Sequence, residues 1–243
     1  APDQPNGPAW GKAFLLLTAS SKLRLGLTGT PFRADDLAFC SARRLKSQIQ
    51  GKMVEQIVPD LCVEPRALIS AGDVRPLEFH FQDGWVEHKK EIQESGEKSS
   101  LSCEKRETWR SRNLRRAIRL SDSSSIAMQL IIRAQRKLEK LRQEHINAAG
   151  LVIAKDIGHA RSIAKFLEED GQKVLLVHSR DNFAARRLSA FQESEENWLV
   201  SVDMCSEGFD APRIRVVSYL TTVVTRSRFV QAITRAARIS PDR

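Results

Sequence analysis

The distribution of apolar residues changes character near Gly150. After it, four short and continuous apolar runs alternate with longer amphipathic segments. The runs lie at Leu151–Ala154, Val174–Val177, Trp198–Val202 and Val216–Leu220. Continuous apolar runs of this length are typical of strands that are buried on both faces, as the strands of parallel sheets are. The alternation therefore predicts an α/β fold, in which helices cover a parallel sheet.

The segments between the runs have helical periodicity. Residues 160–167 carry apolar side chains at helical spacing, and Gly171 follows as a helix stop. Residues 184–191 show the same pattern. Near the C-terminus, a helix over Phe229–Arg238 would place Gln231, Arg235 and Arg238 on one stripe, at about 100° per residue. Two guanidinium groups and an amide one turn apart suit a polyphosphate, although a solvated basic face explains the same spacing.

N-terminal to Gly150 the pattern is less regular. It predicts strands at Leu23–Leu27 and Arg75–Phe81, a helix at Phe39–Ile57, a polar loop at Gln93–Ser102, and helices at Glu104–Leu120 and Ile126–His145. Residues 103–119 contain seven Lys or Arg and two Glu, and four arginines share one helical stripe: Arg112, Arg115, Arg116 and Arg119. Such a stripe either follows a phosphate backbone or forms a solvated face, and the sequence leaves both interpretations open.

Composition narrows the range of partners. The chain has 243 residues, a formal net charge of +9 and a pI of about 9.7, which favours a polyanion such as nucleic acid. The four cysteines are far apart, so we expect neither a zinc site nor a disulfide framework. No apolar run approaches the ~20 residues that span a bilayer, so we expect a cytoplasmic protein without a membrane partner.

Five segments in order resemble the motifs of superfamily 2 helicases, the DEAD/DEAH-like ATP-driven motors, and in particular members related to restriction enzymes. Leu27–Arg33 resembles motif III, Leu151–Lys155 resembles motif IV, and Ser206–Asp210 resembles motif V. Gln231–Arg238 resembles motif VI, and His178–Arg180 resembles the stretch between motifs IV and V. The resemblance implies two RecA-like domains with an ATP site between them.

The resemblance also implies roles for individual residues. Arg235 and Arg238 would be arginine fingers that stabilise charge on the γ-phosphate, and Gln231 would orient the phosphates or the attacking water. Gly208 would let the backbone approach ATP closely, and Asp210 would bind the ribose. Thr28, Gly29 and Thr30 would couple the nucleotide state to the grip on nucleic acid. Ser179 and Arg180 would contact backbone phosphate. Turn capping by the two threonines and loop termination by Asp210 are the structural alternatives.

The sequence departs from the family pattern at several points. Thr234 stands where motif VI usually has Gly, and Val202 stands where many relatives have Thr. Gly7–Ala13 is the nearest approach to a phosphate-binding loop, but it is one residue short and lacks the metal-binding hydroxyl. No Asp-Glu pair follows a buried strand. We therefore expect the Mg²⁺ ligands and the N-terminal RecA-like half of the ATP site to lie outside these residues, upstream of Ala1.

These observations predict three regions: the end of a first RecA-like domain (1–84), a mainly helical connecting segment (85–147) and a second RecA-like domain (148–243). The predicted function is the C-terminal part of an ATP-dependent DNA helicase or translocase, with RNA as the alternative polymer. A non-hydrolysing nucleic-acid-binding or scaffolding module is the second hypothesis. An unrelated nucleotide-binding or transferase domain is the third. The sequence does not determine translocation polarity or oligomeric state.

Overall fold

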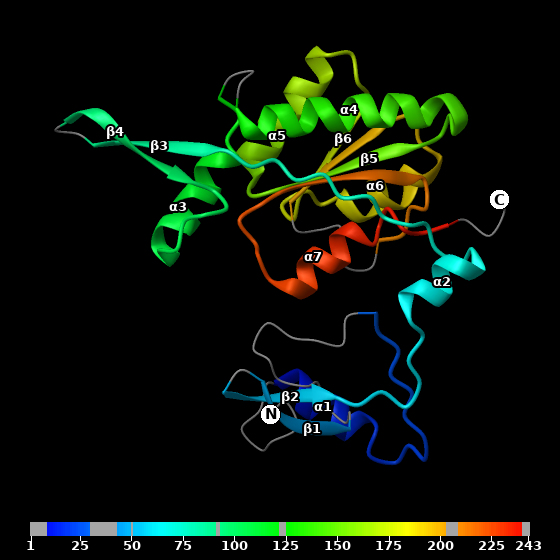
Figure 1. Cartoon of the computed structure of the whole chain (residues 1–243). Helices are drawn as coiled ribbons and strands as arrows, with labels where there is room; N and C mark the ends of the chain where they lie inside the picture. The colour runs from blue at the N-terminus through cyan, green and yellow to red at the C-terminus, as the bar shows by residue number, and fades with distance from the viewer. Residues whose placement is uncertain are drawn as a thin grey trace. The chain divides into compact units, whose positions relative to one another are not determined.

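The computed structural model describes residues 9–29, 43–49, 51–90, 93–121, 125–202 and 209–239. They form two compact units, which are described separately (Figure 1). The first comprises Ala1–Leu68 with Thr225–Gln231, and the second comprises Ile69–Val224 with Ala232–Arg243. None of the helices in the described part of the chain is both long and apolar enough to cross a membrane. The predicted domain boundaries at residues 84 and 147 stay predictions.

The second unit contains a four-stranded parallel sheet with the strand order β6-β7-β5-β8. Its strands are β5 (Ala149–Ala154), β6 (Val174–Val177), β7 (Trp198–Ser201) and β8 (Ile214–Leu220). All residues of the central strands β5 and β7 are buried, and their sequences are apolar without alternation except at the buried Ser201, as expected for strands covered on both faces. The predicted α/β fold with a parallel sheet is confirmed.

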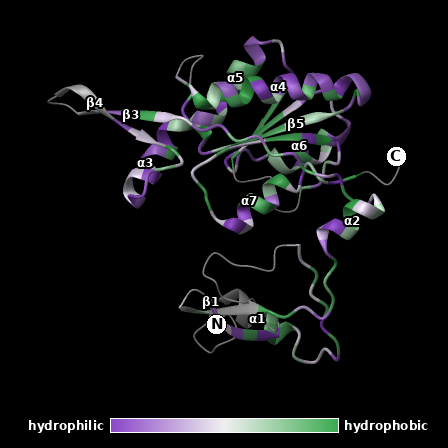
Figure 2. Ribbon diagram, in the orientation of Figure 1, coloured by the Kyte–Doolittle hydropathy of each residue, from purple (hydrophilic) through white to green (hydrophobic). Residues whose placement is uncertain are grey.

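Helices cover both faces of this sheet (Figures 1 and 2). Leu151 and Ile153 of β5 face a core that includes α6 (Ala184–Ala190) and the 3₁₀ helix Phe191–Glu193. Val152 and Ala154 face the opposite core, which is completed by α4 (Ile126–Glu144) and α5 (Ile157–Glu169). Successive side chains of β5 thus point to opposite faces of the sheet, as they do in any β-strand.

The start of α5 is fixed by an N-cap. The Asp156 carboxylate accepts a hydrogen bond from the backbone N–H of His159 at 2.8 Å. That bond stabilises the charged carboxylate and lowers the pKa of Asp156. Burial lowers the pKa of the His159 imidazole, because its charged form is poorly solvated there. The cap therefore holds the crossover between β5 and β6 in a defined geometry.

Gly150 is required by the packing of its neighbour across the sheet. It pairs with Trp198, whose side chain is fully buried, and a Cβ built on Gly150 would lie 2.3 Å from the Trp198 ring. We expect Gly150→Ala to lower the free energy of unfolding by about 1–3 kcal/mol, because a rigid buried indole cannot move aside. Urea unfolding measures this change, with Gly158→Ala as control, since Gly158 has no comparably close neighbour. Equal stability of Gly150→Ala and the unmodified chain would contradict the packing argument.

The first unit contains α1 (Ala9–Leu17) and a hairpin of β1 (Arg44–Ile49) and β2 (Lys52–Ile57). The helix predicted over Phe39–Ile57 is therefore wrong for its described residues. Gly51 has a φ of 78°, which allows the chain to reverse between the two strands. The antiparallel partner supplies the backbone hydrogen bonds that a helix would have supplied locally. The short helix α2 (Pro65–Ala71) follows and crosses the division between the units.

Two strands predicted in the N-terminal third are also wrong. Leu23, Leu25 and Leu27 lie in an irregular, exposed segment, since no described residue pairs with it as a neighbouring strand. Residues 75–84 are irregular as well, and only Val74 forms a β-bridge, with Arg238. Pro76 lies two residues after Val74 and has no N–H with which to continue a ladder. Short apolar runs do not form strands without partners.

A hairpin and a helix form an arm within the second unit. The hairpin consists of β3 (Trp85–Lys90) and β4 (Gln93–Ser100), and α3 (Glu107–Ala117) contacts both strands. The polar loop predicted over Gln93–Ser102 is therefore wrong, because pairing with β3 makes most of it a strand. The helices predicted at Glu104–Leu120 and Ile126–His145 are confirmed as α3 and α4.

Candidate functional site

Two arginines near the C-terminus converge on one short segment after β7. The Arg235 guanidinium donates a hydrogen bond to the carbonyl oxygen of Phe209. The Arg238 guanidinium forms a charged hydrogen bond with the Asp210 carboxylate, and its Nη1 lies 3.5 Å from the Phe209 oxygen. Segments that are 26 to 29 residues apart in sequence thus meet in a compact cationic site.

The two arginines differ in their access to solvent. Arg235 is only 5% exposed, whereas the side chain of Arg238 is 41% exposed and that of Asp210 is 66% exposed. An exposed ion pair is worth little in water, so a phosphate can displace the carboxylate from Arg238 at low cost. Arg235 lacks that freedom, because its removal would leave the carbonyl of the buried Phe209 with only the long contact of 3.5 Å from Arg238. Arg238 is therefore the arginine better placed to bind an incoming anion.

The helix that carries these residues is shorter than predicted. α7 spans Arg226–Ile233, and residues 234–237 form turns with successive bonds from Arg235, Ala236 and Ala237 to carbonyls three positions earlier. The prediction of a helix through Arg238 is thus wrong, and the stripe at about 100° per residue ends at Ile233. The tighter turns end in the β-bridge between Arg238 and Val74.

Arg75 holds this turn in place. Its backbone N–H donates to the Ala237 carbonyl at 2.7 Å, and its guanidinium donates to the carbonyls of Ala236 at 3.4 Å and Ile214 at 3.3 Å. The carbonyls that would continue the helix therefore have partners from a distant segment. The sequence contains no local signal for this role, because Arg75 lies 161 residues before Ala236.

The remaining predicted site residues lie elsewhere or outside the described residues. Gln231 lies on α7 in the first unit, with a partly buried side chain. Thr28 and Gly29 lie in an exposed, irregular segment of the same unit. Gly208 and Thr30 lie outside the described residues. The structure therefore brings together Arg235, Arg238 and Asp210 from the predicted set.

Ser179 and Arg180 lie in the exposed turn that follows β6. The next residue, Asp181, organises this turn, because its carboxylate accepts bonds from the Phe183 N–H and the Arg187 guanidinium, both at 2.9 Å. The Phe183 bond is the main cause of the lowered pKa of Asp181. An ordered turn at the carboxyl end of a parallel strand is a usual place for ligand contacts.

The two departures from the motif pattern have different surroundings. The side chain of Thr234 is exposed in the turn after α7. Val202 is partly buried and packs against the apolar core beneath α4 and α5. Val202 is therefore explained by packing, which a threonine hydroxyl at the same position would weaken.

Arg213 is a buried arginine that the sequence analysis did not identify. Its guanidinium donates hydrogen bonds to the carbonyls of Asn147 at 2.9 Å and Glu196 at 3.0 Å. It also donates to the carbonyls of Phe191 and Ser194, both at 2.7 Å. Burial lowers the pKa of Arg213, but a guanidinium stays charged at neutral pH. The sequence has no clear signal for this role, because Arg213 is followed two residues later by a second arginine, Arg215, within β8.

Comparison with known proteins identifies one domain of this chain. Residues 126–240 match the helicase conserved C-terminal domain. Residues 126–240 therefore belong to the family of helicase conserved C-terminal domains. This helicase segment includes the parallel sheet, the residues that resemble motifs IV to VI, and the convergence of Arg235 and Arg238 on Phe209 and Asp210.

The relatives of this chain are longer than the regions that match it. An uncharacterized protein of Mycobacterium leprae is 32% identical over 240 residues, which cover 96% of this chain and 38% of that protein. A putative helicase of a Sulfolobus islandicus filamentous virus is 30% identical over 95 residues, or 38% of this chain and 17% of the viral protein. The Hef helicase domain of Pyrococcus furiosus is 24% identical over 46% of this chain and 27% of its own, with a TM-score of 0.34. The chain thus spans well under half the length of the mycobacterial protein.

Proposed function

We propose that this chain is the C-terminal part of an ATP-dependent DNA helicase or translocase and that it supplies the arginine side of the ATP site. The observation that carries the proposal is the convergence of Arg235 and Arg238 on the Phe209–Asp210 segment within the helicase domain. Their charges suit the developing negative charge on a transferring phosphoryl group. Arg238 would leave Asp210 for the γ-phosphate, while Arg235 would hold the loop.

The donor set fits a nucleotide in chemical terms. Arg238 offers an exposed guanidinium to phosphate, and Asp210 offers a carboxylate that can accept hydrogen bonds from ribose hydroxyls. Gln231 and Gly208 keep their proposed roles in phosphate orientation and close approach of the backbone. When bound, ATP supplies the phosphoryl group whose transfer drives movement along the nucleic acid.

The Mg²⁺ that accompanies ATP would be held by the other half of the site. Within the described ranges, no group of three or more His, Cys, Asp or Glu side chains could hold a metal ion. The 243 residues also contain no phosphate-binding loop of the Gly-x-x-x-x-Gly-Lys type. The role of this chain is therefore to contribute cations to the nucleotide, and the metal ligands belong to the proposed N-terminal RecA-like half.

DNA is the proposed polymer, with RNA as the alternative. The net charge of +9 favours a polyanion, and Ser179 with Arg180 offers a hydroxyl and a guanidinium in an exposed turn. Thr28, Gly29 and Thr30 are proposed to couple the nucleotide state to the grip on that strand. The cytoplasm is the proposed location.

A non-hydrolysing nucleic-acid-binding module is the second candidate. The burial of Arg235 at 5% exposure and its bond to a backbone carbonyl favour it, because a purely structural arginine has the same surroundings. In that case Arg238 and Asp210 form an ordinary surface ion pair. The two candidates differ in whether nucleotide turnover depends on these arginines.

The proposed function predicts DNA-stimulated ATP hydrolysis. We expect the intact protein to hydrolyse ATP faster in the presence of DNA, and the 243-residue chain alone to show no turnover above background, because the phosphate-binding loop is missing from its sequence. Phosphate release under saturating ATP, with and without single-stranded or double-stranded DNA, measures both. Clear turnover by the stringently purified chain would contradict the assignment of a half-site. An intact protein that binds DNA but never hydrolyses ATP would favour the binding module.

A further inference from the structure

The arm formed by β3, β4 and α3 is not explained by the proposed ATP site. It includes residues 85–119 apart from the two positions 91 and 92, which lie outside the described part of the chain. Figure 1 shows the hairpin and α3 side by side, extending from the same edge of the second unit. Figure 2 shows α3 as predominantly hydrophilic, unlike the strands of the sheet.

A buried polar network makes this arm a defined unit. Asn113 is only 1% exposed, and its amide donates to the Ser99 hydroxyl at 2.8 Å and the Ser100 carbonyl at 3.0 Å. The Asn113 amide oxygen lies 2.7 Å from Nε2 of His88 on the opposite strand, and the Ser99 hydroxyl donates to Glu104 at 2.7 Å. The helix is thereby bonded to both strands of the hairpin, which fixes the direction of its outer face.

Arg116 adds a second connection between the helix and the hairpin. Its guanidinium donates to the backbone carbonyl of Glu87 on β3. At the base of the arm, Ala117 and Ile118 are buried, so the end of α3 is anchored in the second unit. One arginine of the predicted stripe therefore has a structural role, and the three others remain on the outer side.

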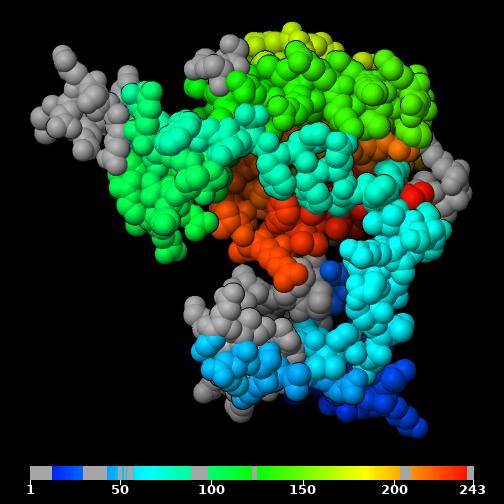
Figure 3. Space-filling view, viewed as in Figure 1, coloured from blue at the N-terminus to red at the C-terminus, as the bar shows by residue number. Residues whose placement is uncertain are grey.

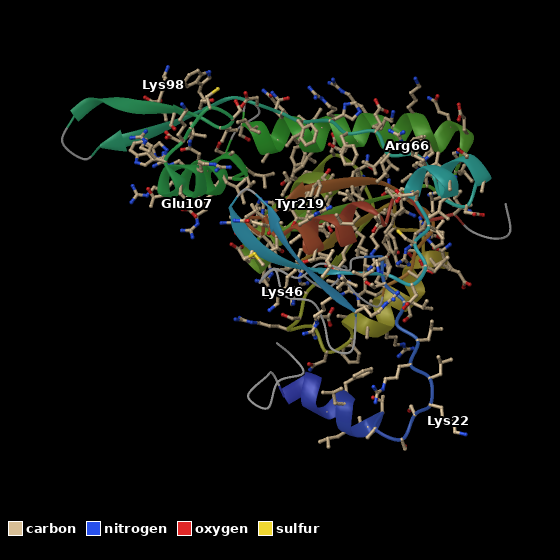
Figure 4. The ribbon with its side chains drawn as sticks, turned by 60° about the horizontal axis from the view of Figure 1, so that its bottom comes forward. Lys22, Lys46, Arg66, Lys98, Glu107 and Tyr219 are labelled. Atoms are coloured by element: carbon tan, nitrogen blue, oxygen red, sulfur yellow. The ribbon has the colours of Figure 1, made fainter. Side chains whose placement is uncertain are left out.

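Arg112, Arg115 and Arg119 are exposed and spaced like one face of a helix, although α3 itself ends at Ala117. No carboxylate of the described residues forms an ion pair with any of the three. Figures 3 and 4 show α3 at the surface, with side-chain nitrogens projecting outward around the helix that carries Glu107. The face is therefore cationic and open to a large partner.

The spacing of the three arginines matches a nucleic-acid backbone. Within α3, the distance from position 112 to position 117 is about 7.5 Å at 1.5 Å per residue, and Arg119 follows two residues after the end of the helix. One strand of a duplex presents a phosphate about every 3.4 Å of axial length, so the face spans roughly three phosphates. Guanidinium groups also bind phosphate through two parallel hydrogen bonds.

We propose that Arg112, Arg115 and Arg119 bind the phosphate backbone of double-stranded DNA. The preference for a duplex over a single strand follows from Trp109, the aromatic residue of α3. The His88 ring packs against the Trp109 ring edge-to-face at 4.8 Å, and the Arg106 guanidinium lies 3.9 Å above it. Trp109 is thus occupied on α3, and the exposed Trp85 lies at the start of β3, outside the arginine face, so that face offers no free aromatic ring as a stacking platform for an unpaired base. The duplex contact is independent of the nucleotide and lies outside the helicase segment at 126–240.

The test compares two triple variants of the 243-residue chain that lose the same charge. R112Q/R115Q/R119Q removes the proposed contacts. R136Q/K140Q/R161Q removes three exposed cations of α4 and α5, none of which is paired with a described carboxylate. Binding to a fluorescent 20-base-pair duplex, and to one of its separated strands, is followed by anisotropy over a range of salt concentrations. Circular dichroism of each variant shows whether the fold is retained.

We expect the arm variant to bind the duplex at least about tenfold more weakly. The slope of log affinity against log salt concentration should become shallower by about 2.7, since each of the three phosphate contacts contributes ~0.9. The control variant should weaken binding by less than threefold, and R112K/R115K/R119K should restore most of the affinity. Equal losses in the two glutamine variants, or a loss confined to single-stranded DNA, would overturn the proposal. Since no ATP is present, an absence of hydrolysis by this protein would not affect the outcome.

Discussion

Replacing Arg238 with alanine in the intact protein is expected to reduce kcat for ATP hydrolysis about 1000-fold or more, with nucleotide binding within several-fold. An arginine that meets the γ-phosphate in the transition state contributes on this scale. The side chain is 41% exposed and is paired with an exposed carboxylate, so its removal should change thermal stability little. Steady-state kinetics together with direct nucleotide titration separates the two effects.

Two companion variants make the Arg238 experiment specific. Arg161→Ala removes an exposed arginine from α5 in the same unit and should retain normal turnover. Arg235→Ala should also abolish hydrolysis, but it leaves the Phe209 carbonyl without its buried donor and should lower stability by about 1–3 kcal/mol. Unchanged kcat in Arg238→Ala would remove that residue from the mechanism and would favour the non-hydrolysing module.

Replacing Arg213 with methionine is expected to destabilise the second unit by about 3–5 kcal/mol. Four backbone carbonyls accept hydrogen bonds from this guanidinium, and the side chain is only 8% exposed. Methionine fills much of the volume but donates no hydrogen bond, so these buried acceptors would lose their partner. The free energy from urea unfolding, with the slope m compared between variants, measures the change.

Two control variants distinguish the effect on stability of the Arg213 hydrogen bonds from the effect of its charge. Arg213→Lys keeps the charge but has fewer donors, so its stability should fall between that of methionine and that of arginine. Arg186→Ala, an exposed arginine of α6, should change stability by no more than about 0.5 kcal/mol. A loss of less than about 1 kcal/mol in Arg213→Met would show that the network does not hold the loops before β5 and β7.

The sequence predicts the strands of the parallel sheet well and the strands of the antiparallel hairpins poorly. The four strands after Gly150 were predicted to within two residues at each end, because strands buried on both faces must be continuously apolar. The hairpins were missed. The segment Gln93–Ser100 has polar residues typical of a loop, and it is a strand because Trp85–Lys90 pairs with it. Backbone pairing can override weak local preference.

In the candidate site, the sequence predicts which residues take part but does not predict how they are arranged. Its residue types were predicted through the motif order, and Arg235, Arg238 and Asp210 do lie together. Periodicity alone predicts a helix that continues beyond Ile233, and it therefore does not give the geometry of these residues. Bonds from Arg75 to the carbonyls of Ala236 and Ala237 occupy the acceptors of that last turn. No local pattern around Arg75 indicates such a contact.

The sequence by itself determined the α/β class, the parallel strands and the helicase C-terminal domain at residues 126–240. These properties depend on short-range apolar periodicity and on the order of motifs, which are both written along the chain. Only the tertiary structure decided which arginine is buried, which is exposed, and which one of the basic stripe is bonded to the hairpin. Those outcomes depend on donors and acceptors brought together from distant segments, as when the Arg116 guanidinium meets the Glu87 carbonyl 29 residues away.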